Sequence, residues 1–211
     1  MRMLKDTSAR NVKGFLTHEF SRVSPKVAEE ILKLARIAES ASPGRVHRDS
    51  AESLYKAVNA TKLMAPPTNC LSPIGEDQLL SGLRAQFPAS FYTAVSRSPQ
   101  VYRGNPFLIE VGLAWGVKEM PGDELAELYR FANRVPLLYQ QSACATFKAV
   151  LSTTWRNYGV SQSRGALPAG PMVIFVHMAS VWVPFTSESK EAIADYDEIQ
   201  KEITLALREA G

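Results

Sequence analysis

The chain has 211 residues, of which 45% are apolar and 21% are charged. These values are typical of a folded globular protein and exclude a disordered or fibrous chain. Two cysteines are too few for a disulfide scaffold or a thiolate zinc site, so we expect Cys70 and Cys144 to be free thiols in a reducing compartment.

The positive charge is unevenly distributed. Residues 1–65 carry a net charge of +5, whereas residues 66–211 carry −2. A basic N-terminal part suggests that any contact with a polyanion is concentrated there, although small helical units also carry such charge for solubility.

No targeting or membrane segment is predicted. Residues 1–6 are rich in charge and lack an apolar run. The apolar stretch 172–185 has roughly 14 residues, whereas a membrane span needs about 20. We therefore expect a cytoplasmic protein without membrane attachment.

Residues 1–65 have the apolar spacing of helices. Apolar side chains recur at intervals of three and four residues, at Phe15, Leu16, Phe20, Val23, Val27, Ile31 and Leu34. Ser24 followed by Pro25 predicts a helix start, because serine caps and proline lacks an N–H that a first turn leaves unused. The segment 40–44 interrupts the pattern, and Asp49 begins another helix.

An extended connection is predicted next. Two prolines in the segment 64–69 remove hydrogen-bond donors and favour extended backbone, so we place a domain boundary near residue 65. Residues 76–84 then form a short helix.

After residue 88 the apolar period changes from 3.6 to 2. Strands are predicted at 91–96 and 107–115, joined through a hairpin-like segment at 102–106. In the second strand, apolar residues alternate with Glu110 and Gly112. A third strand lies within 127–136.

The rest of the chain alternates between helix and strand. Residues 140–153 are helical, and 172–182 are apolar on both faces, as in a central strand. A final helix follows, and Asp195 to Glu198 resembles a capping box at its start. The order predicts an α+β chain, in which a small all-helical N-terminal domain precedes a two-layer α/β sandwich of order βββαβα.

Conventional catalytic groupings are lacking in this sequence. His18, His47 and His177 are scattered, and we interpret His177 as a hydrogen-bonded core residue. The loop 165–171 superficially resembles a phosphate loop, but its prolines delete N–H donors that such a loop needs, so we interpret it as a turn that enters a strand.

Several long strings resemble those of one family. They are MAPPTNCLSPIG at 64–75, FANRVPLLYQQ at 131–141, WRNY at 155–158, the segment 165–180, and PFTSESKEAIAD at 184–195. Together they resemble the B subunit of archaeal type IIB DNA topoisomerases (topoisomerase VI), over nearly the whole chain.

The resemblance implies two domains and several partners. Residues 1–65 would be the helix-two-turns-helix domain and residues 66–211 the transducer domain, with a C-terminal stalk helix cut short at Gly211. It also implies an ATPase domain before residue 1, so the chain resembles a partial B subunit. We expect ATP and Mg²⁺ in the complete subunit and none bound by this chain alone. The expected partners are double-stranded DNA, in a nucleoid-associated setting, and the DNA-cleaving A subunit.

Lys190 is the first candidate site residue. We place it just before or within the first turn of the last helix, where a cation is mildly unfavourable and Glu188 or Glu191 could neutralise it. The resemblance implies a different role, in which Lys190 contacts the γ-phosphate of ATP and reports the nucleotide state to the transducer.

Two further groups are candidates for DNA contact. The family pattern Trp-Lys-x-Tyr, associated with DNA contact, matches Trp155, Arg156 and Tyr158 with arginine in place of lysine. Arginine keeps the charge that a phosphate contact needs. The alternative is a packed helix stop with a solvated arginine.

The second group belongs to the N-terminal part. Arg22, Lys26 and Lys33, together with the N–H groups after Ser24, could hold a DNA phosphate at a helix start, or could form a solvated basic face.

Three functions follow from the sequence. The first is a relay in an ATP-dependent topoisomerase, supplying coupling and DNA guidance but no catalytic residue of its own. The second is a stand-alone, non-specific DNA-binding module. The third is a small-molecule kinase, which would need a Gly-Ser-rich phosphate loop that 165–171 does not provide.

Overall fold

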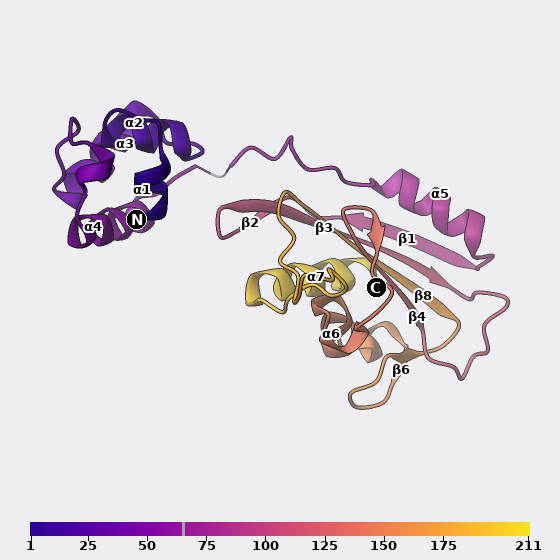
Figure 1. Ribbon diagram of the computed structural model, residues 1–211. Helices are drawn as coiled ribbons and strands as arrows, with labels where there is room; N and C mark the ends of the chain where they lie inside the picture. The colour runs from indigo at the N-terminus through magenta and orange to yellow at the C-terminus, as the bar shows by residue number, and fades with distance from the viewer. Residues whose placement is uncertain (65) are drawn as a thin grey trace. The chain divides into compact units, whose positions relative to one another are not determined.

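The computed structural model describes residues 1–64 and 66–211, and the chain divides into two compact units between Pro66 and Pro67. The boundary that we predicted near residue 65 coincides with the one position outside the described residues. Each unit is described below by itself (Figure 1).

The N-terminal unit is helical, as its apolar spacing predicted. Its helices are α1 (Arg2–Asp6), α2 (Val12–Glu19), α3 (Pro25–Ala35), the short 3-10 helix η1 (Pro43–Arg45) and α4 (Arg48–Ala60). The break expected at 40–44 is the connection that contains the start of η1. Ser24 caps α3 by accepting a hydrogen bond from the Val27 N–H at 3.3 Å.

The buried face of α3 differs in detail from the predicted one. Ala28, Ile31, Leu32 and Ala35 point into the core, whereas Leu34 is 57% exposed. This set has the i, i+3, i+4, i+7 spacing of a single helix face, and it excludes Leu34. The face packs in one cluster with Phe15, Leu16, Leu54 and Ala57 from α2 and α4.

The C-terminal unit is built on a mixed sheet. Its strands are β1 (Phe91–Ser96), β2 (Gln100–Tyr102), β3 (Asn105–Trp115), β4 (Glu127–Ala132), β5 (Val135–Pro136) and β8 (Met172–Ser180), with the order β1-β3-β8-β4-β5 and β2 paired beside β3. A separate pair joins β6 (Ser161–Gln162) to β7 (Pro168–Ala169). The three strands expected between 91 and 136 are therefore five, because β2 forms before the turn into β3 and a turn divides the third expected strand into β4 and β5.

The centre of the sheet combines both strand directions. β3 runs antiparallel to β1 and β8, while β4 runs parallel to β8. The parallel pair requires a crossover, which passes through η2 (Gln141–Ala143), α6 (Ala145–Ser152) and η3 (Trp155–Tyr158).

Helices cover the two faces of the sheet unequally. α6 and α7 (Asp197–Ala210) lie on one face, and α5 (Glu76–Gln86) lies along β1 and β3 on the other (Figure 1). The sequence predicted α5 as a helix but did not assign it to a layer. The two-layer sandwich is thus the sheet with α6 and α7, and α5 covers part of the outer face.

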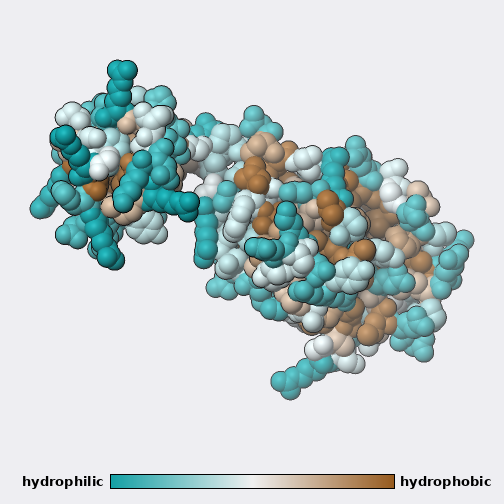
Figure 2. Space-filling model, in the orientation of Figure 1, coloured by the Kyte–Doolittle hydropathy of each residue, from teal (hydrophilic) through white to brown (hydrophobic). Residues whose placement is uncertain are grey.

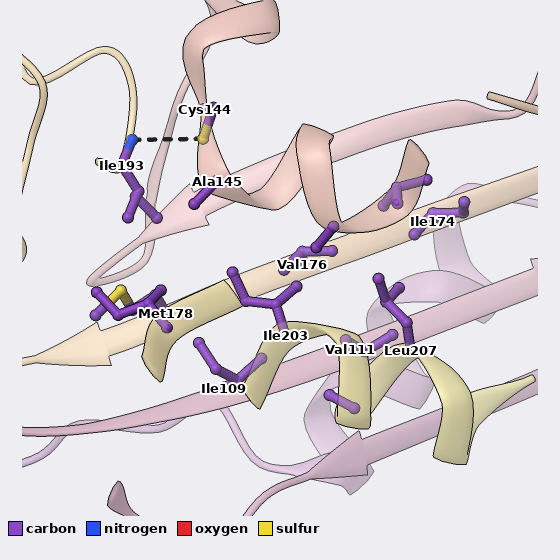
Figure 3. Close-up of a cluster of buried hydrophobic side chains, with 14 of the residues drawn as sticks. Ile109, Val111, Cys144, Ala145, Ile174, Val176, Met178, Ile193, Ile203 and Leu207 are labelled. Atoms are coloured by element: carbon purple, nitrogen blue, oxygen red, sulfur yellow. Dashed lines mark hydrogen bonds between the residues drawn. The ribbon is translucent and has the colours of Figure 1, made fainter. Parts of the chain in front are cut away.

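The main core fills the space between the sheet and the helices α6 and α7. Ile109, Val111, Ile174, Val176 and Met178 project from β3 and β8 toward Ala145, Ile203 and Leu207 (Figure 3). Alternate residues of the same strands, including Ala114 and Val173, face α5 instead and pack with Leu83. This alternation explains why both central strands are apolar on both faces.

Viewed from one side, the C-terminal unit shows hydrophobic patches among hydrophilic residues, whereas the same view of the N-terminal unit is mostly hydrophilic (Figure 2). Among the described residues, no helix is long and apolar enough to cross a membrane.

Candidate functional sites

Lys190 lies at the tip of a loop and is exposed to solvent. A bridge between Phe185 and Ile193 closes the loop, and the Thr186 N–H donates to the Ala192 oxygen at 2.9 Å. The last helix begins only at Asp197, so our placement of Lys190 at its first turn is wrong. Asp195, which we predicted to begin a capping box, forms an ion pair with Lys148 at 2.9 Å, and the residue before the helix is Tyr196, without a side-chain cap.

The backbone of Lys190 has a left-handed conformation, with φ of 56°. This conformation is uncommon for a residue with a side chain. Within the described residues, neither Glu188 nor Glu191 forms an ion pair with Lys190; Glu191 accepts hydrogen bonds from Gln140 at 2.8 Å and Ser189 at 3.2 Å. The neutralisation that the sequence allowed is absent from this part of the structure.

The segment WRNY forms η3, directly after α6. Trp155 is 1% exposed, and its indole N–H donates to the Val150 oxygen at 2.8 Å. The Trp155 ring therefore packs in the core, in an edge contact with Tyr158. Tyr158 is half-buried and donates to the Arg208 oxygen at 3.1 Å.

Arg156 and Asn157 are the exposed members of this segment, and the Arg156 guanidinium donates to the Gln162 oxygen at 3.0 Å. It lines a cavity of about 330 Å³ together with Arg164 and the hydroxyl residues Ser152, Thr154 and Ser163, among others. Sequence reasoning missed Arg164, because the fold of the 159–165 segment, and not proximity in the chain, brings it to this cavity.

In the N-terminal unit, Arg22 and Lys26 are exposed at the start of α3, and Lys33 is exposed two turns further along. Seven residues of helix separate the two lysines by about 10 Å on one face. The helix start offers few N–H donors, because Pro25 has none and the Val27 N–H is taken by Ser24. The charge of this surface therefore comes mainly from the side chains of Arg22, Lys26 and Lys33, and little from backbone N–H groups.

His177 lies in the core, as predicted, and it forms a buried pair with Glu110. Both side chains are fully buried, and the His177 Nδ1 lies 2.7 Å from the Glu110 Oε2. The His177 Nε2 accepts the Arg134 N–H at 2.9 Å, so the ring proton must be on Nδ1, from which it is donated to the carboxylate.

Glu110 also accepts hydrogen bonds from the residues that immediately precede α5. Its two oxygens accept the N–H groups of Ile74 at 2.8 Å and Gly75 at 2.7 Å. Burial raises the pKa of Glu110, but the hydrogen bonds from His177, Ile74 and Gly75 outweigh burial and leave the pKa below its ordinary value. Sequence reasoning missed this role, since a glutamate that alternates with apolar residues is typical of an exposed strand face.

An apolar groove of about 450 Å³ lies beside α5, over the part of the sheet that α5 does not cover. Its lining includes Leu79, Phe87 and the stacked pair Phe131 and Phe175, whose ring centres are 4.6 Å apart.

Other features show no site chemistry. No group of three or more metal-binding side chains occurs among the described residues. The loop 165–171 contains β7, which pairs with β6, in keeping with a strand entry. Cys70 and Cys144 are both free, as predicted.

A protein-family model and the curated relatives indicate the same family. The protein-family model described as "Topoisomerase VI B subunit, transducer" matches residues 66–211. The B subunits of type 2 DNA topoisomerase 6 from Methanococcoides burtonii and Archaeoglobus fulgidus are each 47% identical over all 211 residues, which cover 34% and 35% of their lengths. The chain thus spans about a third of the length of the curated relatives that it matches.

Among solved structures, the crystal structure of the B-subunit of the DNA gyrase from Myxococcus xanthus overlaps 62% of this chain and 38% of that chain, with a TM-score of 0.39 and 19% identity. The overlap is partial. The match to the transducer model covers more than half of the chain, and the chain therefore belongs to the topoisomerase VI B subunit family.

Proposed function

We propose that this chain is the part of a type IIB DNA topoisomerase B subunit that relays nucleotide state to the DNA-cleaving A subunit and contacts DNA. Residues 1–65 would serve as the helix-two-turns-helix domain and residues 66–211 as the transducer. The family membership supports this assignment.

The observation that carries the proposal is the position of Lys190. An exposed lysine at the tip of a closed loop, with no ion pair among the described residues, is available to a phosphate outside this chain. Lys190 would contact the γ-phosphate of ATP held with Mg²⁺ by a separate ATPase domain.

DNA contact would come from exposed basic side chains of both units. Arg156 and Arg164 line one cavity, and Arg22, Lys26 and Lys33 form the basic surface of α3. Trp155 and Tyr158 would support Arg156 by packing and not by touching DNA. Contacts of this type are made to phosphates, so binding would depend on salt and not on base sequence.

The relay is tested in the complete B subunit assembled with its A subunit. Lys190→Ala should abolish ATP-dependent strand passage while nucleotide binding persists, because the ATPase domain keeps its own ligands. The matched control is Lys201→Ala, an exposed lysine on α7, which should leave strand passage unchanged. Full activity of the Lys190→Ala enzyme would overturn the assignment.

The isolated chain provides a second test. It should hydrolyse no ATP, since we assign it coupling and DNA guidance but no hydrolytic group. ATP hydrolysis by the chain that disappears in Lys190→Ala would show that this lysine is catalytic in its own right, contrary to the proposal.

A second candidate function is a stand-alone, non-specific DNA-binding module, which the charge of +5 over residues 1–65 favours. It predicts micromolar, steeply salt-dependent binding of duplex DNA without any partner subunit. Loss of that binding in Arg22→Glu/Lys26→Glu would favour this module, whereas copurification with an A subunit would favour the relay.

A further inference from the structure

The apolar groove beside α5 brings together four aromatic side chains. Phe87 follows the end of the helix, Tyr129 and Phe131 come from β4, and Phe175 comes from β8. The Phe131 and Phe175 rings stack, and the ring centres of Phe87 and Tyr129 lie 5.5 Å apart. All four residues keep some exposure to solvent, so their rings are accessible from the groove.

The size and the lining of the groove suit a small molecule. Its volume of about 450 Å³ lies in the range of pockets that hold such ligands. Leu79 and Leu83 add to its apolar lining, and Gln78, Gln86 and the Tyr129 hydroxyl supply a few polar groups. Among the described residues that line the groove, none is charged. The lining therefore favours a flat, mainly apolar body that needs few hydrogen bonds.

Gly82 leaves the helical wall of the groove bare. A glycine weakens the interior of a helix relative to an alanine, and a Cβ added at Gly82 would meet nothing within 4 Å. Packing within the described chain therefore does not require a glycine at this position. Without a side chain there, a ligand can lie directly against the backbone of α5.

A carboxylate lies beside the aromatic rings. The Tyr129 hydroxyl donates to the Glu127 Oε2 at 2.8 Å. Burial and this carboxylate raise the pKa of Tyr129 to about 12, so the hydroxyl keeps its proton at neutral pH. Glu127 is exposed and forms no ion pair within the described part of the chain. Because the faces of aromatic rings also attract positive charge, the charge distribution of the groove is complementary to a cation.

We propose that this groove is a binding site for a small organic cation with a flat aromatic body. The body lies between the aromatic rings and the bare backbone at Gly82, while Glu127 and the ring faces attract the positive charge. The site is independent of the proposed relay and of DNA contact, since neither Lys190 nor Arg156 lines the groove.

Three probes of similar shape and different charge test the site in the 211-residue chain. They are N-methylquinolinium, which is a permanent cation, quinoline, which is uncharged at neutral pH, and naphthalenesulfonate, an anion. Titrations followed by ¹⁵N NMR should show N-methylquinolinium binding about three- to thirtyfold more tightly than quinoline, the range that cation–π contacts provide. Naphthalenesulfonate should bind more weakly than either. The amide shifts should gather at Gly82, Tyr129 and Phe175.

Variants separate the shape of the groove from its charge. Gly82→Leu fills the groove and should abolish binding of both N-methylquinolinium and quinoline. Ser81→Leu is the matched control, at an exposed neighbour that does not line the groove, and should leave binding unchanged. Glu127→Gln removes the charge but keeps the size, so it should weaken N-methylquinolinium about threefold and leave quinoline unaffected.

Gly82→Ala adds a single methyl group and strengthens the helix, so its weaker binding could not be attributed to misfolding. The proposal is overturned if N-methylquinolinium and quinoline bind the natural chain equally, if the shifts gather outside the groove, or if none of the three probes binds. Equal effects of Gly82→Leu and Ser81→Leu would overturn it as well.

Discussion

Glu110 is a fully buried charge that the fold satisfies with four donors, from Ile74, Gly75, Ser96 and His177. An ionised carboxylate is very costly to bury without such partners. The donors come from the α5 entry, β1 and β8, so this residue fastens three segments that are distant in sequence.

Replacing Glu110 with glutamine should destabilise the C-terminal unit. Glutamine keeps the size of the side chain but turns one acceptor oxygen into a donor that faces other donors. We expect a loss of about 2–3 kcal/mol in the free energy of unfolding, the value of hydrogen bonds to a charged group. Urea denaturation followed by tryptophan fluorescence measures the loss, and Glu119→Gln, at an exposed carboxylate, should cost almost nothing.

The same residue makes stability depend on pH. Since the pKa of Glu110 is lower in the folded chain than its ordinary value of 4.5, the folded state binds the proton less readily than the unfolded state. The stabilisation is complete above pH 4.5 and is lost as the pH falls through the folded pKa. Acid titration of the unfolding free energy should therefore be steeper for the natural chain than for Glu110→Gln, and parallel curves would contradict this account.

At the scale of elements, local signals in the sequence predicted most of the fold. Ser24 and Pro25 marked the start of α3, and the period of two marked β1 and β3 correctly. The predictions that failed were those that depended on tertiary contacts. Asp195 had the pattern of a cap but pairs with Lys148. Lys190 precedes the helix and lies in a loop that the bridge between Phe185 and Ile193 closes.

The residues of the candidate sites were likewise predictable from local sequence signals but not where tertiary contacts decide their orientation. The string WRNY identified Arg156, but the sequence could not show that Trp155 turns inward, because a large aromatic before a basic residue fits either role. Glu110 and His177 face each other in the register of β3 and β8, and register between distant strands is not readable from one sequence.

The packing of α5 against the sheet depends on a glycine in β3. A Cβ added at Gly112 would lie 2.8 Å from the end of the Leu83 side chain, so a larger residue there would force Leu83 of α5 to shift. Gly112→Val should displace α5 and cost about 1–3 kcal/mol, as overpacking does. Gly82→Ala is the contrasting variant in α5 itself, where a Cβ meets nothing within 4 Å. It should stabilise by up to about 1 kcal/mol, and thermal unfolding measures both changes.

At the scale of the whole molecule, each unit has its own buried cluster. The smaller unit has the size at which a single core gives only marginal stability. All three tryptophans, at 115, 155 and 182, lie in the C-terminal unit. Tryptophan fluorescence therefore reports on that unit alone, whereas far-ultraviolet circular dichroism reports on both.

Ile31→Ala removes a fully buried side chain from the N-terminal unit. We expect it to cost about 2–5 kcal/mol and to lower the helical signal at low denaturant, while the fluorescence midpoint stays unchanged. Ile203→Ala, in the C-terminal unit, should instead lower the fluorescence midpoint, together with the part of the helical signal that comes from that unit. A single transition shifted equally in both signals by both variants would show that the units unfold together.

The hydrogen bonds made by residues 73–76 also determine where the chain can be truncated to produce the C-terminal unit alone. The Pro73 oxygen accepts from the Arg134 guanidinium at 2.6 Å, Ile74 and Gly75 donate to Glu110, and the Glu76 side chain accepts the Ser96 N–H at 2.8 Å. A fragment that begins at Glu76, the first residue of α5, would keep every helix and strand of the unit. It would lose the Ile74 and Gly75 N–H groups, which are two of the donors to the buried Glu110 carboxylate. Recombinant fragments that begin at Pro73 or earlier keep both backbone donors, so the Glu110 carboxylate remains hydrogen-bonded within the protein.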